Sequence, residues 1–187
     1  YFTMHEIGRT LDDAIGEAFD KCGKTMGFDY PAGPIIDNYS KNGNPKKFKF
    51  PIPKVKGLDF SFSGFKTSVL NFINKNINLD QNFIKNNVED LCASIQFTLI
   101  EILMLKINLA VRKTGITQIA LGGGVAANSE LRKRIIHEGE KNNLKTYIPN
   151  IDYTTDNAAM IALVGYLKYK NLHFGNLKQK ALSNYKI

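Results

Sequence analysis

The sequence predicts a mixed α/β protein whose second half alternates between strand and helix. Two observations carry this prediction. Apolar residues recur at helical spacing over residues 11–26 and again over residues 88–109. Short apolar runs at residues 116–121 and 144–148 each lead into a helical pattern, which is typical of the strands of an α/β protein.

The first elements of the chain are predicted from helix-end and turn signals. Residues 1–8 read as the end of a strand, and Thr10 is in the position of the N-cap of a helix that ends at Gly27. The proline-rich segment 30–34 predicts a turn, and a second short helix is expected over residues 35–41.

The middle of the chain predicts a loop followed by two helices. Residues 41–56 contain three prolines and six lysines and predict a loop with a short extended segment. A helix is expected after residues 59–66, up to about Asn76. Residues 78–87 are polar and predict a connector, and residues 88–113 give the strongest helical pattern in the chain.

The lysines of the middle loop alternate with aromatic residues and leave two interpretations open. Interleaved with Phe48 and Phe50, they could bind the backbone of RNA or could form a solvated loop. These lysines are Lys46, Lys47, Lys49, Lys54 and Lys56.

Composition limits the classes of protein to which the chain can belong. The formal charge of +8 suits a polyanion such as RNA, although a compositional bias toward Lys, Asn and Ile would give the same charge. No uninterrupted apolar run reaches the ~18 residues of a membrane span, and the start does not resemble a signal peptide, so a cytoplasmic protein that does not enter a membrane is expected. Since Tyr1 is not an initiator residue, we expect an upstream part of a longer protein to be missing.

Both cysteines, Cys22 and Cys92, lie in apolar helical patterns. This favours buried free thiols in a reducing compartment over a disulfide or a metal-binding pair.

The glycine loop at residues 122–124 is the strongest candidate for ligand binding. Consecutive glycines after an apolar strand let the backbone approach a ligand closely, and the N–H groups of the following helix favour negative charge there. Asn128 could cap that helix or bind a ribose or base. A plain strand–helix turn is the alternative, and the segment fits neither a Walker loop nor the dinucleotide pattern.

The remaining candidate site residues are two aspartates. Asp20 lies beside the apolar face of its helix, where it needs hydrogen bonds that a ligand hydroxyl could supply. Asp156 is expected, with Thr155 as the other option, to cap a helix that ends at about Lys170, and could instead be one ligand of a cation. One carboxylate cannot hold a metal by itself, and the three histidines do not offer a metal-binding spacing.

Five blocks of the sequence occur in the order found in one known family. They are Gly8-Arg-Thr-Leu-Asp-Asp-Ala-Ile-Gly-Glu-Ala-Phe-Asp-Lys21, Tyr30-Pro-Ala-Gly-Pro34, Gly57-Leu-Asp-Phe-Ser-Phe-Ser-Gly-Phe-Lys-Thr67, Gly122-Gly-Gly-Val-Ala-Ala-Asn128 and Thr155-Asp-Asn-Ala-Ala-Met-Ile-Ala162. In these blocks the chain resembles the TsaD family, the tRNA N6-adenosine threonylcarbamoyltransferases.

This resemblance implies an α/β fold of the actin-like, Hsp70-like ATPase type, also described as ribonuclease H-like. Residues 1–187 would form the C-terminal lobe of a two-lobed enzyme whose N-terminal lobe is absent from the sequence. Residues 41–113 would be a largely helical insertion, and residues 155–187 a closing helix followed by a basic tail.

The resemblance also implies an activity and a set of site residues. The activity is transfer of the threonylcarbamoyl group from threonylcarbamoyl-AMP to N6 of adenosine 37 in tRNAs that read codons beginning with A. No catalytic residue is implied. Substrate-binding positions carried over from the family, or expected in its glycine loop, are Asp20, Gly33, Asp37, Gly123, Gly124 and Asn128.

The resemblance further implies a metal ligand and protein partners, and one position of the chain departs from the family pattern. Asp156 would bind a divalent metal, Fe²⁺ or Zn²⁺, together with histidines of the absent N-terminal part, and TsaB-like and TsaE-like proteins would be partners. Ala32 stands where the family usually has glycine. Half an active site is therefore expected. The alternatives are a nucleotide-binding lobe of an ATPase or sugar kinase, or a non-catalytic assembly lobe; a zinc protease would need a histidine pair that this chain lacks.

Overall fold

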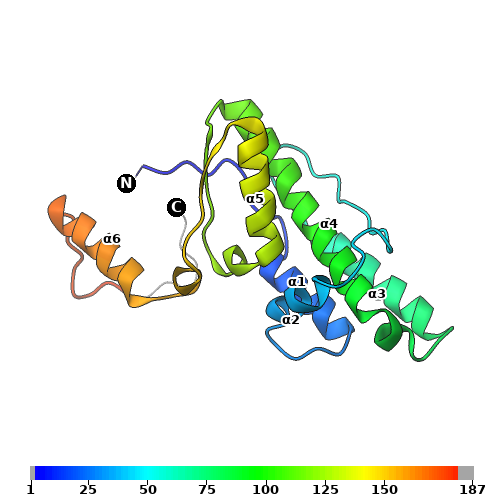
Figure 1. The fold of residues 1–187 in the computed structure, drawn as a ribbon. Helices are drawn as coiled ribbons and strands as arrows, with labels where there is room; N and C mark the ends of the chain where they lie inside the picture. Colours follow the sequence, from blue (N-terminus) through cyan, green and yellow to red (C-terminus); the bar gives the residue numbers. More distant parts are fainter. Residues whose placement is uncertain (1–2, 181–187) are drawn as a thin grey trace.

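The computed structural model describes residues 3–180 and shows a helix-rich α/β protein with one small parallel sheet (Figure 1). In chain order the elements are α1 (Ile15–Thr25), α2 (Gly33–Ser40), α3 (Ser63–Ile77), α4 (Phe83–Thr114), β1 (Gln118–Ala120), the 3₁₀ helix η1 (Gly124–Ala127), α5 (Ser129–Asn142), β2 (Lys145–Tyr147), the 3₁₀ helix η2 (Ile151–Tyr153) and α6 (Ala158–Lys170).

The first four helices enclose the main hydrophobic core. Each contributes the face on which its apolar residues recur every three or four positions, and α4 lies against all three others. Phe62 and Phe65 are buried in this core. Cys22 and Cys92 are buried and free, as predicted, and burial raises the pKa of each thiol to about 12. The other fully buried members include Ala18, Phe19, Ile36, Val69, Ile73, Leu91, Ile95 and Leu99.

Helix α4 is, by length and composition alone, the one helix of residues 3–180 that could cross a membrane. However, 44% of its most apolar stretch of 18 residues is buried inside the protein. Core helices of soluble proteins pass the same test, and Leu91, Ile95 and Leu99 of α4 are central to the helical core. Packing of α4 against the other helices thus accounts for its apolar character, and evidence for a membrane span is weak.

The second half of the chain forms a small β–α–β unit beside α4. Strands β1 and β2 are parallel, with Ile119 paired to Thr146, and α5 connects them. Helix α5 packs against α4 through Leu131 and Ile135, which form a second core with Ile100 and Met104. Both predicted strands and the helix between them are therefore confirmed, although each strand has only three residues.

The predicted strand at the start of the chain is wrong for the part that the structure describes. Residues 3–9 belong to no strand, and only an isolated parallel bridge joins Thr10 to Phe60. A strand is stable only beside a hydrogen-bonded neighbour, and this segment meets one only at its end, where the Arg9 carbonyl accepts the Phe60 N–H at 2.8 Å. Thr10 is not the N-cap either: α1 begins at Ile15, and the Thr10 hydroxyl donates to the Asp13 carbonyl instead.

Other boundaries shift for local reasons. Helix α2 begins at Gly33, two residues earlier than predicted, because Pro34 fits the first turn of a helix. The predicted connector is partly helical, since α4 begins at Phe83 and is kinked at Asn87. Gly115 ends α4 in the left-handed conformation at φ +69°, which confirms the predicted helix stop.

Helix α6 lies apart from the body formed by the first five α-helices (Figure 1). Asn157 caps it by accepting the Met160 N–H, so the predicted caps, Thr155 and Asp156, are wrong. None of its residues is buried, although most of them are apolar. The end of the predicted basic tail, residues 181–187, lies outside the described residues.

Candidate functional site

The structure brings most of the predicted site residues to one region, where α1 contacts α2 and η1 and where η1 leads into α5. Gly16 of α1 packs against η1, since a Cβ at this glycine would lie 3.4 Å from Val125 Cγ2. Three segments that are distant in the sequence thus become neighbours, as expected if they form one site.

Asp20 receives its hydrogen bonds from the chain itself. Its Oδ1 accepts the backbone N–H groups of Ala32 (2.8 Å) and Gly33 (3.3 Å) at the start of α2. The hydrogen bonds that this carboxylate was expected to need therefore come from the turn twelve residues downstream. Negative charge at the N-terminus of α2 also suits the helix dipole. A direct ligand contact of Asp20 stays a prediction.

The methyl group of Ala32 fills space next to α1. Ala32 is buried, and a Cβ built on Gly23 would lie 2.2 Å from the Cβ of Ala32. Real Cβ atoms do not approach so closely, so the alanine at this turn is accommodated by the glycine that faces it.

Asp37 of α2 is bound to the first residue of α5. Its Oδ1 accepts the Ser129 hydroxyl (2.8 Å), and its Oδ2 accepts the Ser129 N–H (3.1 Å). A carboxylate at this helix N-terminus satisfies a backbone donor and interacts favourably with the helix dipole. Asp37 therefore joins α2 to the loop that follows β1.

Asn128 is the N-cap of α5, as one of the two interpretations predicted. Its Oδ1 accepts the Leu131 N–H (2.9 Å), and its Nδ2 donates to Gln96 Oε1 (2.7 Å). Gln96 donates in turn to the Ser40 hydroxyl at 2.7 Å. With 9% of Asn128 exposed, this chain of hydrogen bonds is nearly dry, and it ties α2, α4 and α5 together. A pocket of about 250 Å³ lies beside it, lined in part by Ser40, Gln96 and Ser129.

The glycine loop before α5 is open. Gly123 adopts φ +81°, a conformation that favours glycine, and a Cβ on Gly122, Gly123 or Gly124 would meet no atom within 4 Å. Within residues 3–180, the backbone N–H groups of these three glycines have no hydrogen-bond acceptor. Consecutive free N–H donors at the start of a helix can bind the oxygens of a phosphate or a sugar.

Asp156 is exposed between η2 and α6. Among the described residues, no group of three or more His, Cys, Asp or Glu side chains is placed to hold a metal ion. The donor set of residues 3–180 therefore does not fit a metal site, because a single carboxylate is one ligand of at least three. Metal binding by Asp156 stays a prediction that depends on ligands from elsewhere.

Sequence reasoning missed two acidic residues just before α1. Asp12 accepts the N–H groups of Phe62 and Ser63 at the start of α3, and also the Ser61 hydroxyl. Burial acts to raise the pKa of Asp12, but these hydrogen bonds outweigh it and lower the pKa. The local signal was a pair of aspartates at the start of the helical pattern of residues 11–26.

Asp13 forms ion pairs with two lysines. Lys21 lies 2.8 Å and Lys66 3.1 Å from its carboxylate oxygens, and hydrogen bonds from these lysines lower the pKa of Asp13. Lys21 also pairs with Glu17, four residues earlier on α1, at 2.6 Å. Asp12 and Asp13 thus connect α1 to α3, and so hold the helix that carries Asp20.

Comparison with known proteins identifies strong similarity over almost the whole chain. Residues 1–163 match the model of the TsaD family, described as tRNA N6-adenosine threonylcarbamoyltransferase. Curated proteins with that name include one from Christiangramia forsetii and one from Riemerella anatipestifer, each 52% identical over 187 residues, which is 100% of this chain and 55% of the relative. One from Thermosipho africanus is 46% identical over 97% of this chain and 54% of its own length. The chain thus spans about half the length of the curated relatives it matches.

Proposed function

We propose, from the premise that this chain belongs to the TsaD family of tRNA N6-adenosine threonylcarbamoyltransferases, that it forms one half of the active site of such an enzyme. The reaction would transfer the threonylcarbamoyl group from threonylcarbamoyl-AMP to N6 of adenosine 37 in tRNAs that read codons beginning with A. The observation that carries the proposal is the open glycine loop, Gly122–Gly124, beside a site built from α1, α2 and α5.

The glycine loop would bind the adenosine half of threonylcarbamoyl-AMP. Gly123 and Gly124 present free N–H donors and no side chain, so a flat or anionic group can lie directly against the backbone. Asn128 and Asp37 fix the start of α5, which follows this loop, while Asp20 fixes the start of α2 at Gly33. We infer that these polar residues act first by holding the walls of the pocket in place.

The chemistry needs positioning more than a protein nucleophile. The adenine N6 amine attacks the carbamoyl carbonyl, a C–N bond forms, the C–O bond to the AMP phosphate breaks, and the amine proton is released as AMP leaves. Charge grows on the leaving phosphate, and preorganised N–H donors stabilise such charge without reorganising. Holding the amine and the carbonyl together supplies the rest of the rate increase.

The wider properties of the enzyme follow as proposals. The fold would be half of an actin-like, two-lobed protein, which the β1–α5–β2 unit supports, with α3 and α4 inside a helical insertion over residues 41–113. Asp156 would be one ligand of Fe²⁺ or Zn²⁺, which would act as a Lewis acid toward the substrate; its other ligands would lie outside this chain. A cytoplasmic location and TsaB-like and TsaE-like partners remain predictions.

A chimera tests the function directly. This chain would replace the matching part of the Christiangramia forsetii relative, to which it is 52% identical. With tRNA and threonylcarbamoyl-AMP, we expect the chimera to form threonylcarbamoyladenosine, detected by mass spectrometry of digested tRNA, and the isolated 187-residue chain to form none. A Gly123→Ala change in the chimera should lower turnover, because alanine is strained at φ +81°.

A matched control is Gly64→Ala, which adds the same methyl group to the first turn of α3, where it meets no atom within 4 Å. It should leave turnover unchanged. A folded chimera that produces no modified adenosine, beside an active relative, would reject the proposed transfer. Turnover by the isolated chain would reject the half-site.

A further inference from the structure

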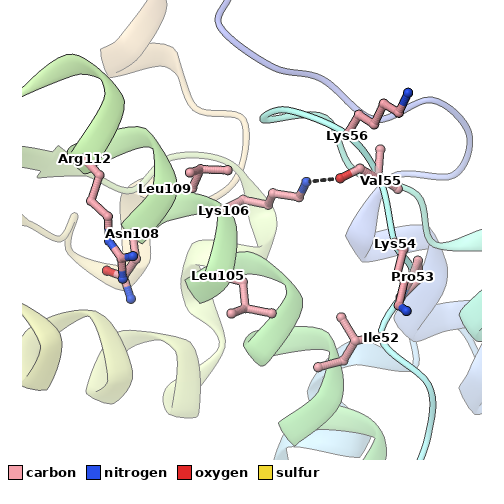
Figure 2. Close-up of a pocket in the computed structure, with 10 residues that line it drawn as sticks. All are labelled: Ile52, Pro53, Lys54, Val55, Lys56, Leu105, Lys106, Asn108, Leu109 and Arg112. Carbon is pink, nitrogen blue, oxygen red and sulfur yellow. Dashed lines mark hydrogen bonds between the residues drawn. The ribbon is translucent and has the colours of Figure 1, made fainter.

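A pocket of about 790 Å³ lies outside the candidate site, between the loop at residues 52–56 and the C-terminal half of α4 (Figure 2). Lys54, Val55 and Lys56 on the loop lie opposite Leu105 and Lys106 on the helix. The two sides come from segments about fifty residues apart in the sequence, so only the folded chain has this pocket.

The wall of the pocket is fixed by one lysine. Lys106 Nζ donates hydrogen bonds to the carbonyl oxygens of Val55 and Gly57, both at 2.8 Å. These bonds attach the loop to α4, the longest helix of the described residues. The loop residues therefore do not need to be ordered when a ligand arrives, and this favours binding.

The lining is strongly basic and contains no acidic residue. Within the described part of the chain, Lys54, Lys56 and Arg112 form no ion pair with a carboxylate. The acid connected to the lining is Glu138, which accepts hydrogen bonds from Asn108 of the pocket and from Asn142 of α5. Positive charges without counter-charges beside a concave surface attract anions.

The structure separates the lysines of the middle loop into two groups. Phe48 and Phe50 pack against the helical core. Lys47, also on the loop, forms an ion pair with Asp90 of α4 at 2.6 Å. This part of the loop is anchored to the protein. Lys54 and Lys56 instead line the pocket, and within residues 3–180 they form no ion pair with an acidic residue. Of the loop lysines, Lys54 and Lys56 therefore line the pocket, and RNA binding by the loop stays a prediction.

We propose that this pocket binds the phosphate backbone of RNA. Lys54, Lys56 and Arg112 would contact phosphates, while exposed Leu105 and Ile52 give an apolar surface for the ribose faces. The lining has no aromatic side chain on which a base could stack, so binding would not depend on base sequence. The choice of RNA among polyanions rests on the proposed function, in which tRNA is the substrate.

Binding of fluorescently labelled, unmodified tRNA to the 187-residue chain tests this inference. Fluorescence anisotropy would be recorded over a series of salt concentrations. Reversing three charges together, with Lys54→Glu, Lys56→Glu and Arg112→Glu, should weaken binding on the order of tenfold or more at 100 mM salt. The slope of log affinity against log salt should decrease by about two to three, or roughly one for each phosphate that the variant no longer binds.

The matched control changes the net charge by the same amount elsewhere. Lys46→Glu, Lys49→Glu and Lys85→Glu reverse three exposed lysines outside the pocket and should alter affinity by less than about threefold. Equal weakening by both triple variants, or no weakening by either, would overturn the pocket as the RNA site. Competition by polyglutamate as strong as that by tRNA would overturn RNA in favour of an acidic protein segment. Lys106 is left unchanged because it holds the loop.

The binding test and the transfer test can fail separately. An active chimera whose tRNA affinity is insensitive to the pocket variants would reject this inference and keep the proposed function. An inactive, folded chimera whose tRNA affinity falls with the pocket variants would reject the proposed function and keep this inference.

Discussion

Helices α3 and α6 are similar in length and both rich in apolar residues, but they differ in how much of that apolar surface is buried. Helix α3 buries Phe65, Val69 and Ile73 completely, whereas α6 buries no residue. The apolar residues of α3 lie on one face, and those of α6 surround it. A helix that is apolar all round is stable only when it is enclosed on several sides. Apolar content therefore predicts that a helix will be covered, but not what covers it.

The same contrast separates the two ends of the described chain from its centre. Residues 3–9 belong to no strand and no residue of α6 is buried, while α1 to α4 share one core and α5 packs on α4 in a second. Both ends join a chain that spans about half the length of its relatives. The core of the described residues therefore leaves both end segments uncovered.

Matched isoleucines test this contrast with the largest expected effect. Ile73 in α3 is fully buried, and Ile161 in α6 is 72% exposed. Ile73→Ala should lower the free energy of unfolding of the 187-residue chain by about 2–5 kcal/mol, because it leaves a cavity in the core. Ile161→Ala should change it by less than about 0.5 kcal/mol. Urea unfolding followed by circular dichroism measures both.

The chimera sharpens the comparison of the two isoleucines. If α6 packs against the rest of the relative, Ile161→Ala becomes destabilising there while the effect of Ile73→Ala is retained. A large loss from Ile161→Ala in the isolated chain would mean that α6 is already packed, against the exposure seen in the structure.

The contact between Gly23 and Ala32 gives the next largest effect. Gly23→Ala would place two methyl groups 2.2 Å apart, so we expect destabilisation toward the upper end of the roughly 1–3 kcal/mol typical of overpacking. Ala32→Gly in the same chain should restore most of the loss, since it removes the opposing methyl group. Thermal unfolding of both single variants and the double variant gives the coupling free energy.

Additive effects at these two positions would contradict the steric explanation. As a control, Gly64→Ala adds a methyl group to a helix where no atom lies within 4 Å, and it should not reduce stability. The experiment also decides whether Gly23 compensates for Ala32, which stands where the family usually has glycine.

How much of this architecture could be predicted depends on the range of each interaction. Helix α4, its stop at Gly115 and the cap at Asn128 were predicted because periodicity and capping are local properties of the sequence. The strands at 116–121 and 144–148 were predicted for the same reason, although only three residues of each pair in the structure.

The interactions that were not predicted are between residues distant in the sequence. Asp12 caps a helix fifty residues downstream, and the partners of Asp20 lie twelve and thirteen residues away. Spacing does not encode such pairs, so the donors of the hydrogen bonds that Asp20 was expected to need could not be identified from the sequence. The caps predicted at Thr155 and Asp156 failed by one or two residues, because neighbouring Thr, Asp and Asn can all serve as caps.

Two asparagine caps give the smallest effect and the most direct comparison of the two regions. Asn128 caps α5 and Asn157 caps α6, each by accepting a backbone N–H three residues ahead, at 2.9 and 3.0 Å. Only Asn128 also donates to a buried partner, Gln96 Oε1. Asn157→Ala should cost about 1 kcal/mol of helix stability, confined to α6 and visible as faster hydrogen exchange there.

Asn128→Ala should cost about 2 kcal/mol and lower the stability of the whole chain, because it removes the cap and leaves the buried Gln96 oxygen without a donor. Asn128→Ser separates these two contributions: serine can still cap the helix, so it should recover the part due to the cap and leave the part due to Gln96. Equal losses at Asn128 and Asn157 would mean that the hydrogen-bonded chain from Asn128 through Gln96 to Ser40 adds nothing to the cap. A larger loss at Asn128 that Asn128→Ser recovers only in part would show that this chain stabilises the start of α5, and with it the position of the glycine loop.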